Sequence, residues 1–198
     1  MSERERVLWQ GEYIRVVKRG HWEYVQRTNV TGIVCIVAVT DDEKLILVEQ
    51  FRPPVQARVV ELPAGLVGDV PGEEHEALDA AARRELLEET GYEAAGMEVL
   101  FEGAPSAGLS DEHLTFFLAT GLRKVAPGGG DESEDITLHE VPLADLLAFL
   151  RRRQAEGVII DAKIFSPLYF HAQRRREASP PNLTGGRPSS ASGEAMDG

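Results

Sequence analysis

The 198-residue sequence predicts an α+β fold, in which helices pack on both sides of a mixed sheet. The first third of the chain holds a series of short runs rich in β-branched and aromatic residues, which are typical of strands. A segment made mostly of the strong helix formers Ala, Leu, Glu and Arg follows at 74–90. Further strand-like runs then precede two helical segments near the C-terminus. This order of strands and helices fits a layered sandwich.

Composition limits the class of protein. Hydrophobic residues make up 42% of the chain, which suits one domain with a sizeable core. The 33 acidic residues outnumber the 21 basic ones, so the net charge is −12 and nucleic acid is not an expected partner. No run approaches the ~20 apolar residues of a membrane span, and we expect a soluble, cytoplasmic protein without membrane contact. The single cysteine, Cys35, lies in an apolar run and is interpreted as a buried hydrophobic residue.

The N-terminal third is predicted to form two β-hairpins and one further strand. Each hairpin pairs two short runs across a turn of glycine or acidic residues. Pro53-Pro54 ends the second hairpin, and Pro63-Ala64-Gly65 stops the strand after it. The five predicted strands are 13–18, 22–27, 31–40, 44–51 and 59–62.

The rest of the chain is predicted to form a helix, three strands and two more helices. Gly91 supplies the C-terminal stop of the helix at 74–90. Pro142 suits the first turn of the second helix, and Pro167 predicts a kink in the third. The predicted strands are 97–102, 113–119 and 136–141, and the helices are 142–154 and 161–172.

Three parts of the chain follow from these elements. Residues 1–30 form an N-terminal strand region with too little apolar content for a core of its own. Residues 31–175 form the main domain. The tail, 176–198, is rich in Ser, Pro, Gly and Asn, and we expect it to be disordered.

Three glutamates share one face of the helix at 74–90. Glu85 and Glu89 are four residues apart, and Glu88 adjoins Glu85 at a spacing of three. Like charges at these spacings cost about 0.2–0.5 kcal/mol per pair. Arg83 and Arg84 compensate in part, and divalent cations such as Mg²⁺ would compensate more, because they prefer oxygen ligands. A solvated, Glu-rich surface would show the same spacing, so the pattern alone leaves both interpretations open.

The residues around these glutamates resemble a known family. Arg84-Glu85-Leu86-x-Glu88-Glu89-x-Gly91-Tyr92 matches the core of the Nudix box, with Glu76 at the family spacing upstream. The segment 61–65, Glu-Leu-Pro-Ala-Gly, resembles the strand and loop that open the box in the ADP-ribose pyrophosphatase branch. The chain departs from the pattern between Gly65 and Glu76, where ten residues stand in place of five. An insertion within 67–74 explains this without disturbing the helix.

The resemblance implies a Nudix-type α/β/α sandwich, preceded by an N-terminal β-hairpin region, that hydrolyses a diphosphate with Mg²⁺, or Mn²⁺ as a substitute. It implies metal ligands at Glu85, Glu89 and Glu134, with the backbone carbonyl of Ala64 as a fourth. Arg84 is expected to orient a carboxylate of the box. Glu88 is expected to be a ligand or the partner that orients one.

Two loops compete for the general base. The acidic segment 131–136 resembles the loop that carries the base in bacterial ADP-ribose pyrophosphatases, where Glu132 takes that position. The glycines at 128–130 would let such a loop move, although a merely flexible acidic loop would look the same. The rival is Glu112, in the loop between the two strands after the box, which could also be an ordinary turn residue.

The resemblance also implies substrate contacts and a partner. Arg52, at a strand end, is expected to bind phosphates or a terminal ribose, unless it is simply exposed. Trp22 could stack on a nucleobase, although core or dimer packing explains it equally well. ADP-ribose, cleaved to AMP and ribose 5-phosphate, is the first expected substrate, with GDP-mannose or another nucleotide sugar as the alternative. A non-catalytic nucleotide sensor is a further alternative, but it would not need all three glutamates. Residues 1–30 are expected to pair across a homodimer.

Overall fold

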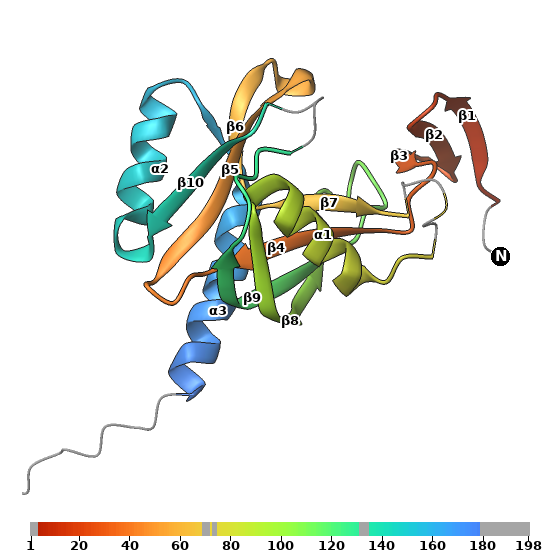
Figure 1. Cartoon of the computed structure of the whole chain (residues 1–198). Coiled ribbons are helices and arrows are strands. Elements are labelled where there is room, and N and C mark those ends of the chain that lie inside the picture. Colours follow the sequence, from red (N-terminus) through yellow and green to blue (C-terminus); the bar gives the residue numbers. More distant parts are fainter. Residues whose placement is uncertain (1–3, 69–71, 73–74, 131–134, 179–198) are drawn as a thin grey trace, which may run out of the picture.

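The computed structural model describes residues 4–68, 72, 75–130 and 135–178. Glu132, Glu134 and the tail from 179 onward therefore lie outside the described residues. Two four-stranded sheets form the body of the fold, and a three-stranded N-terminal sheet lies to one side of them (Figure 1). The predicted α+β class is confirmed, with the strands divided between two mixed sheets instead of one.

The first body sheet has the order β7-β4-β9-β8. Residues Val34–Ala38 of β4 are each at most 1% exposed, so both faces of this strand are covered. Such a strand belongs in the middle of a sheet, and β4 pairs with β9 in parallel and with β7 in antiparallel. The four strands are β4 (Gly32–Ala38), β7 (Ala64–Val67), β8 (Tyr92–Gly103) and β9 (Leu114–Lys124).

The second body sheet has the order β10-β5-β6-β11. Its central strand β5 is almost wholly buried between Leu45 and Gln50. The pair β6 and β11 is parallel, and the other pairs are antiparallel. The four strands are β5 (Lys44–Arg52), β6 (Ala57–Glu61), β10 (Thr137–Pro142) and β11 (Ile159–Ile160).

The predicted second hairpin is wrong. The runs 31–40 and 44–51 do form consecutive strands, β4 and β5, but these strands belong to different sheets. An isolated bridge between Val39 and Leu45 marks the point where the chain crosses over. Both strands are apolar on both faces, so each one takes a central place in its own sheet, flanked by strands that come later in the sequence.

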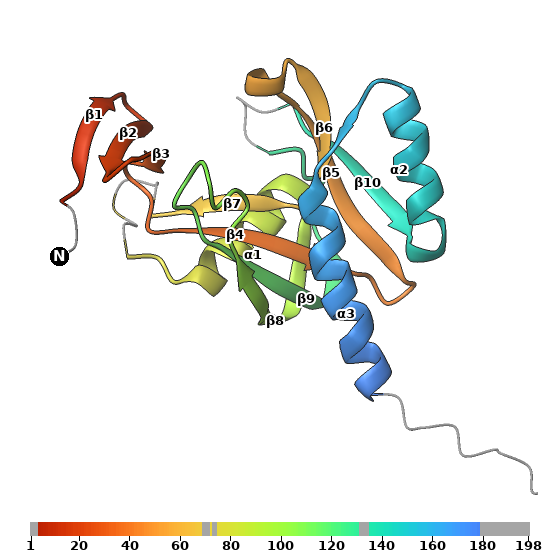
Figure 2. The same cartoon turned by 180° about the vertical axis from the view of Figure 1, so that it is seen from behind.

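Helices cover both sides of the body, as predicted. Helix α1 (Leu78–Thr90) packs on β4, β7 and β8, while α3 (Phe165–Ala178) lies on the opposite side, where it contacts β8 (Figures 1 and 2). Helix α2 (Leu146–Ala155) packs beside β10 and β11 of the second sheet. Three short 3₁₀ turns join these elements: η1 (Pro53–Val55), η2 (Leu143–Asp145) and η3 (Ala162–Ile164).

Two hydrophobic clusters hold the layers together. One lies under α1, where Ala81, Ala82 and Leu86 are 0% exposed against β4 and β9. The other fills the space between the two body sheets, α2 and η3, and includes the fully buried Ile164. At ~25 cal/mol per Å² of apolar surface, these clusters supply most of the driving force for folding. Helix α1 is therefore fixed against the first sheet along its whole apolar side.

Several element boundaries differ from the predictions. Helix α1 begins at Leu78 and not at residue 74, whereas Gly91 does end it, with a left-handed φ of 71°. Strand β7 begins at Ala64, inside the segment that the Pro and Gly residues marked as a stop. Pro142 is the last residue of β10, just before η2. Pro167 lies in the first turn of α3, where proline is tolerated without a kink. Helix α3 also continues to Ala178, past the predicted start of the tail.

The N-terminal sheet consists of the predicted hairpin and one strand that was not predicted. It attaches to the body at the loop between β8 and β9, where the amide of Val25 donates to the carbonyl of Leu109 at 2.8 Å. An ion pair of 2.7 Å between Arg27 and Glu112 reinforces this contact. Its strands are β1 (Arg6–Gln10), β2 (Ile14–Arg19) and β3 (Trp22–Arg27). The division of the chain at residues 30 and 175 stays a prediction.

Among the described residues, no helix has both the length and the apolar character that a bilayer crossing requires.

Candidate active site

Arg84 connects Glu76, just before α1, with Glu85 and Glu88 on the helix. It donates to both carboxylate oxygens of Glu76, at 3.1 and 3.2 Å, and to Glu85 at 2.9 Å and Glu88 at 3.2 Å. A further bond of 3.3 Å reaches the carbonyl of Leu66 on β7. The hydrogen bond to Glu76, together with the charge of Glu85, raises the pKa of Arg84 above its usual value against the opposing effect of burial. These contacts are what an orienting role for Arg84 requires.

The three glutamates of the helix are not equivalent. Glu89 is 3% exposed, and one of its carboxylate oxygens accepts a hydrogen bond of 3.1 Å from the backbone amide of Ala64. The side chain of Glu85 is 14% exposed, whereas that of Glu88 is 52% exposed. A solvated surface face therefore describes Glu88 but not Glu85 or Glu89. The carboxylates of Glu85 and Glu89 both face the protein interior. Their negative charges therefore need nearby cations or hydrogen-bond donors.

Glu85 lies directly against Gly65 of β7. A Cβ added at Gly65 would come within 1.9 Å of the Cδ atom of Glu85, so no larger residue fits there without moving the carboxylate. The start of β7 thus receives Glu85 and Glu89 from α1 at two consecutive residues, Ala64 and Gly65. Helix and strand together bring the carboxylates and the carbonyl group of Ala64 into one region.

The donor set in this region suits a hard divalent cation. Carboxylates of Glu85 and Glu89 and a backbone carbonyl are all oxygen donors, which Mg²⁺ prefers. Among the described residues, no group of three acidic, histidine or cysteine side chains is placed to hold a metal ion. Arg84 forms ion pairs with Glu76, Glu85 and Glu88. The predicted ligand Glu134 lies outside the described residues. The assignment of metal ligands therefore remains a proposal.

A cavity of about 270 Å³ opens beside Ala64 and Gly65. Arg52, at the end of β5, lies in its wall and forms a two-point ion pair with Glu61 of β6, at 2.8 and 2.6 Å. Glu112 lies in the same wall, paired with Arg27. The lining residues are Arg27, Ile33, Cys35, Arg52, Glu61, Ala64, Gly65, Leu66, Pro105, Glu112, Leu114 and Lys163. We call this the central cavity.

A second cavity, of about 380 Å³, lies under the N-terminal sheet. Trp22 and Tyr24 of β3 form one wall, and the loop between β8 and β9 forms the other. Glu112 lines both cavities, so the two spaces adjoin. The structure thus brings Trp22, Arg52 and Glu112 to neighbouring cavities although they are far apart in the sequence. We call this second space the aromatic cavity.

The glycines at 128–130 have a role that the sequence analysis missed. The amides of Gly129 and Gly130 donate to the carbonyls of Glu89 and Glu88, at 2.9 and 3.0 Å, and so cap the C-terminal end of α1. Gly128 has a φ of 73°, and a Cβ there would lie 2.4 Å from the carbonyl carbon of Thr90. In the structure these glycines allow close backbone packing against the C-terminal end of α1.

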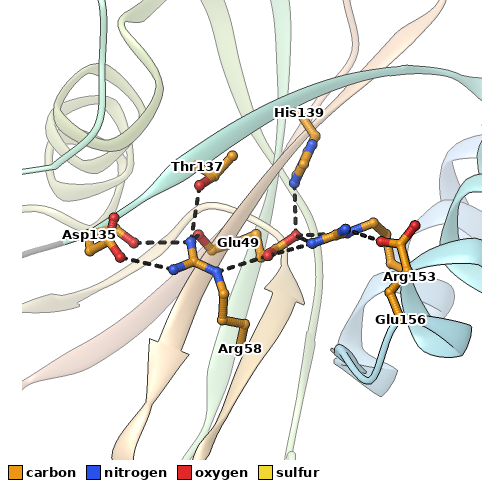
Figure 3. Close-up of polar contacts among 7 residues, drawn as sticks. All are labelled: Glu49, Arg58, Asp135, Thr137, His139, Arg153 and Glu156. Atoms are coloured by element: carbon orange, nitrogen blue, oxygen red, sulfur yellow. Dashed lines mark hydrogen bonds and ion pairs between the residues drawn. The ribbon is translucent and has the colours of Figure 1, made fainter.

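A buried glutamate on β5, Glu49, organises a separate polar network. Glu49 is 2% exposed and accepts hydrogen bonds from Arg58, Arg153 and His139 (Figure 3). Burial would raise the pKa of Glu49, but the bonds from Arg153, His139 and Arg58 outweigh it and lower the pKa below its usual value. Arg58 also pairs with Asp135 at 2.9 Å. A charged residue inside an apolar run was the sequence signal for this network.

Comparisons with known proteins identify a domain family and relatives of the chain. The chain matches the NUDIX domain model over residues 30–162. It is 38% identical to the ADP-ribose pyrophosphatase of Mycobacterium tuberculosis over 151 residues, which cover 75% of this chain and 69% of that protein. It is also 38% identical over 124 residues to the methanol dehydrogenase activator of Bacillus methanolicus. This match covers 62% of this chain and 64% of that protein, which is less than two thirds of either.

A solved structure shares the fold. The crystal structure of an ADP compounds hydrolase superposes with a TM-score of 0.68 and covers 90% of this chain and 95% of its own, at 23% sequence identity. The domain match extends over more than half of the chain, and it includes the acidic helix and β7 against which Glu85 and Glu89 lie. The chain belongs to the Nudix hydrolase family.

Proposed function

We propose that this chain hydrolyses the diphosphate bond of a nucleoside diphosphate sugar, with ADP-ribose, cleaved to AMP and ribose 5-phosphate, as the first substrate. The observation that carries the proposal is the position of Glu85 and Glu89 against Gly65 and Ala64, which themselves line the central cavity. Arg52 in the same cavity offers a cation for a substrate with two phosphates. The relative named ADP-ribose pyrophosphatase supports the choice of substrate.

The residues around the central cavity have distinct tasks in this proposal. Glu85, Glu89 and the carbonyl of Ala64 would hold Mg²⁺ or Mn²⁺, with Glu134 as a further ligand. Bound Mg²⁺ offsets the charge of the diphosphate and lowers the pKa of a water molecule. Arg84 keeps Glu85 in position through their 2.9 Å ion pair, and Glu88 either joins the ligands or helps Arg84 to orient them.

Two residues that are far apart in the sequence, Arg52 and Trp22, bind the substrate in this proposal. Arg52 is held in place by its two bonds to Glu61, so its guanidinium group is pre-positioned for phosphate or terminal ribose oxygens. Trp22, 55% exposed in the wall of the aromatic cavity, offers a flat apolar surface to a nucleobase. The diphosphate would then lie in the central cavity between these groups. The proposed base, Glu132, accepts the proton from the attacking water.

A substrate screen tests the proposal. ADP-ribose, GDP-mannose, UDP-glucose and NADH are incubated with the protein and Mg²⁺, and a phosphatase that acts only on monophosphate products releases phosphate for detection. We expect ADP-ribose to be hydrolysed fastest and all hydrolysis to stop when a chelator removes the metal. Faster cleavage of GDP-mannose would move the function to another nucleotide sugar. Binding of ADP-ribose without hydrolysis of any of the four would indicate a sensing module.

The base is tested by comparing two glutamates. We propose Glu132 as the base, by its resemblance to the family position, and Glu112 as the rival, since it lines both cavities. Glu132→Gln is expected to lower kcat by about 100-fold or more, and Glu112→Gln by less than about 10-fold, at saturating ADP-ribose and Mg²⁺. The reverse order would transfer the role to Glu112, whose ion pair with Arg27 would then serve to position it.

We also propose that the active species is a homodimer formed through the N-terminal sheet. Trp9 and Tyr13 of this region are 56% and 73% exposed, which leaves large apolar surfaces facing water in the monomer. Light scattering after size exclusion is expected to give twice the mass of the chain, and Trp9→Asp is expected to give the monomer. Leu147→Asp, an equally exposed position on α2, is the control and should leave the mass unchanged. A monomeric wild type would refute the proposal.

A further inference from the structure

Lys163 is a third cation at the central cavity, and it has no part in the proposed mechanism. It belongs to η3, which is separated from the end of β11 by one residue. Strand β11 runs parallel to β6, and the amide of Asp161 donates to the carbonyl of Val60 at 3.0 Å. These contacts join η3 to β6, the strand that carries Glu61. Glu61 and Lys163 line the same cavity.

The turn that presents Lys163 is well fixed. Asp161 caps η3 through one carboxylate oxygen, which accepts from the backbone amide of Lys163 at 2.9 Å. Its other carboxylate oxygen forms an ion pair with the ammonium group of Lys163. The next residue, Ile164, is 0% exposed in the core between the sheets. The ammonium group therefore has a defined place at the cavity wall, while the side chain keeps 37% of its surface exposed.

The charge of the central cavity gives Lys163 its significance. Among the described residues, the lining holds three cations, at Arg27, Arg52 and Lys163, and two carboxylates, at Glu61 and Glu112. Each of the two arginines is paired with one of those carboxylates. The acidic partner of Lys163 is Asp161, which is not part of the lining. Lys163 thus supplies the excess positive charge of this lining, in a chain with a net charge of −12.

Lys163 borders two cavities. Burial raises the pKa of the Cys35 thiol to about 12, and the positive charge of Lys163 opposes that rise. Cys35 also lines the central cavity, so the ammonium group acts on this cavity electrostatically as well as by contact. On its other side, Lys163 borders a smaller cavity of about 210 Å³ that Phe101, Phe116 and Ser166 help to line. Lys163 therefore stands where the two spaces meet.

We propose that Lys163 binds the phosphate that leaves with the non-nucleoside half of the substrate. This proposal rests on the proposed function and names the residue that recognises one end of the substrate. The nucleoside is directed toward the aromatic cavity, which adjoins the central cavity at Glu112. The sugar phosphate then extends toward the smaller cavity, across Lys163. An ammonium group with three donors is a compact phosphate ligand.

Kinetics and product binding of Lys163→Met test the proposal. With ADP-ribose and saturating Mg²⁺, KM is expected to rise about 10-fold, the loss of one charge-assisted hydrogen bond, while kcat changes less than about 3-fold. Calorimetric binding of ribose 5-phosphate is expected to weaken about 10-fold, and that of AMP less than about 3-fold. Lys163→Arg keeps the charge and is expected to restore most of both affinities.

Two further variants separate a direct contact from a structural effect. Lys44→Met breaks a Lys–Asp pair of similar exposure, 36%, at the opposite end of β5 from Arg52, and it should leave KM unchanged. Asp161→Asn removes the partner of Lys163 but keeps an acceptor for the cap of η3, and its KM is expected to stay the same or fall.

The outcomes distinguish this proposal from the proposed function. A KM for Lys163→Met within about 2-fold of wild type, in an active enzyme, would reject the role of Lys163 alone. An equal rise in KM for Asp161→Asn would show that Lys163 acts by holding the turn, and equal weakening of AMP binding would place it at the wrong end of the substrate. A wild-type protein without activity on any nucleotide sugar would reject the proposed function, and this inference with it.

Discussion

Glu89→Gln is expected to lower kcat for ADP-ribose by at least about 100-fold without unfolding the protein. Changing a residue that only orients a metal ligand lowers activity about 10- to 100-fold, and loss of the ligand itself should cost more. Glutamine matches the shape of the buried side chain, and its amide oxygen can still accept the 3.1 Å hydrogen bond from Ala64. What it lacks is the negative charge that holds a divalent cation. Glu85→Gln, next to Gly65, is expected to give a loss of the same order.

The measurement is kcat over a range of Mg²⁺ concentrations, with thermal unfolding followed by circular dichroism. Glu93→Gln is the matched control, since it makes the same substitution just after α1 at an exposed carboxylate paired with Arg123. It should retain wild-type kcat. Turnover close to wild type in both Glu85→Gln and Glu89→Gln would remove the metal assignment, whatever the substrate.

Glu49→Gln is expected to lower the free energy of unfolding by about 3 kcal/mol, within the range found when one partner of a buried ion pair is lost. The 2% exposed carboxylate accepts two bonds of 2.7 Å from Arg153 and one of 2.9 Å from Arg58. Without its charge, two arginines near the core lose their common partner. Helix α2 is tied to β5 through Arg153, so the contact between this helix and the second sheet should weaken.

Urea titration followed by circular dichroism measures this loss. Glu156 is a second partner of Arg153, and the Glu156 side chain is 46% exposed. Glu156→Gln should therefore lower the free energy of unfolding by at most about 1 kcal/mol. A loss of the same size in both variants would show that Arg153, and not the burial of Glu49, determines the effect.

The stability contributed by Glu49 also depends on pH. Its pKa in the folded protein is lowered, so the contribution is fully present above the unfolded-state pKa of about 4.3. It is lost as the pH falls through the lower, folded-state value. Wild type should therefore lose more stability than Glu49→Gln between neutral pH and the acid range. Parallel pH profiles for the two proteins would contradict this.

The sequence predicted local structure well and pairing between distant segments poorly. The hairpin of β2 and β3 could be found because its two strands and its turn are adjacent. The hairpin assigned to β4 and β5 was wrong because runs that are apolar on both faces do not show which strand lies beside them. Strand β7 was missed since Pro63 and Gly65 are usually stop signals, yet Gly65 is needed here for the approach of Glu85.

The candidate site shows the same division. The spacing of Glu85, Glu88 and Glu89 was visible in the sequence, but their different burial depends on how α1 lies against β7. The network of Glu49 joins residues from β5, β6, β10 and α2, and Arg153 lies 104 positions away from Glu49. Lys163 was not considered because a lone lysine after a short strand carries no local signal. Contacts of this kind are set by the topology and not by the neighbouring sequence.

Because the segment 125–130 caps the C-terminal end of α1, the chain tolerates insertions and deletions before this helix better than after it. At the N-terminal end, the chain has ten residues between Gly65 and Glu76, twice the number in the family pattern, and the helix still forms. At the C-terminal end, the amides of Val125, Ala126, Gly129 and Gly130 all donate to carbonyls of residues 88–91. One inserted residue there would shift every later donor off its acceptor. Insertions and deletions among natural relatives, or in a designed library, should therefore accumulate before this helix and be rare after it.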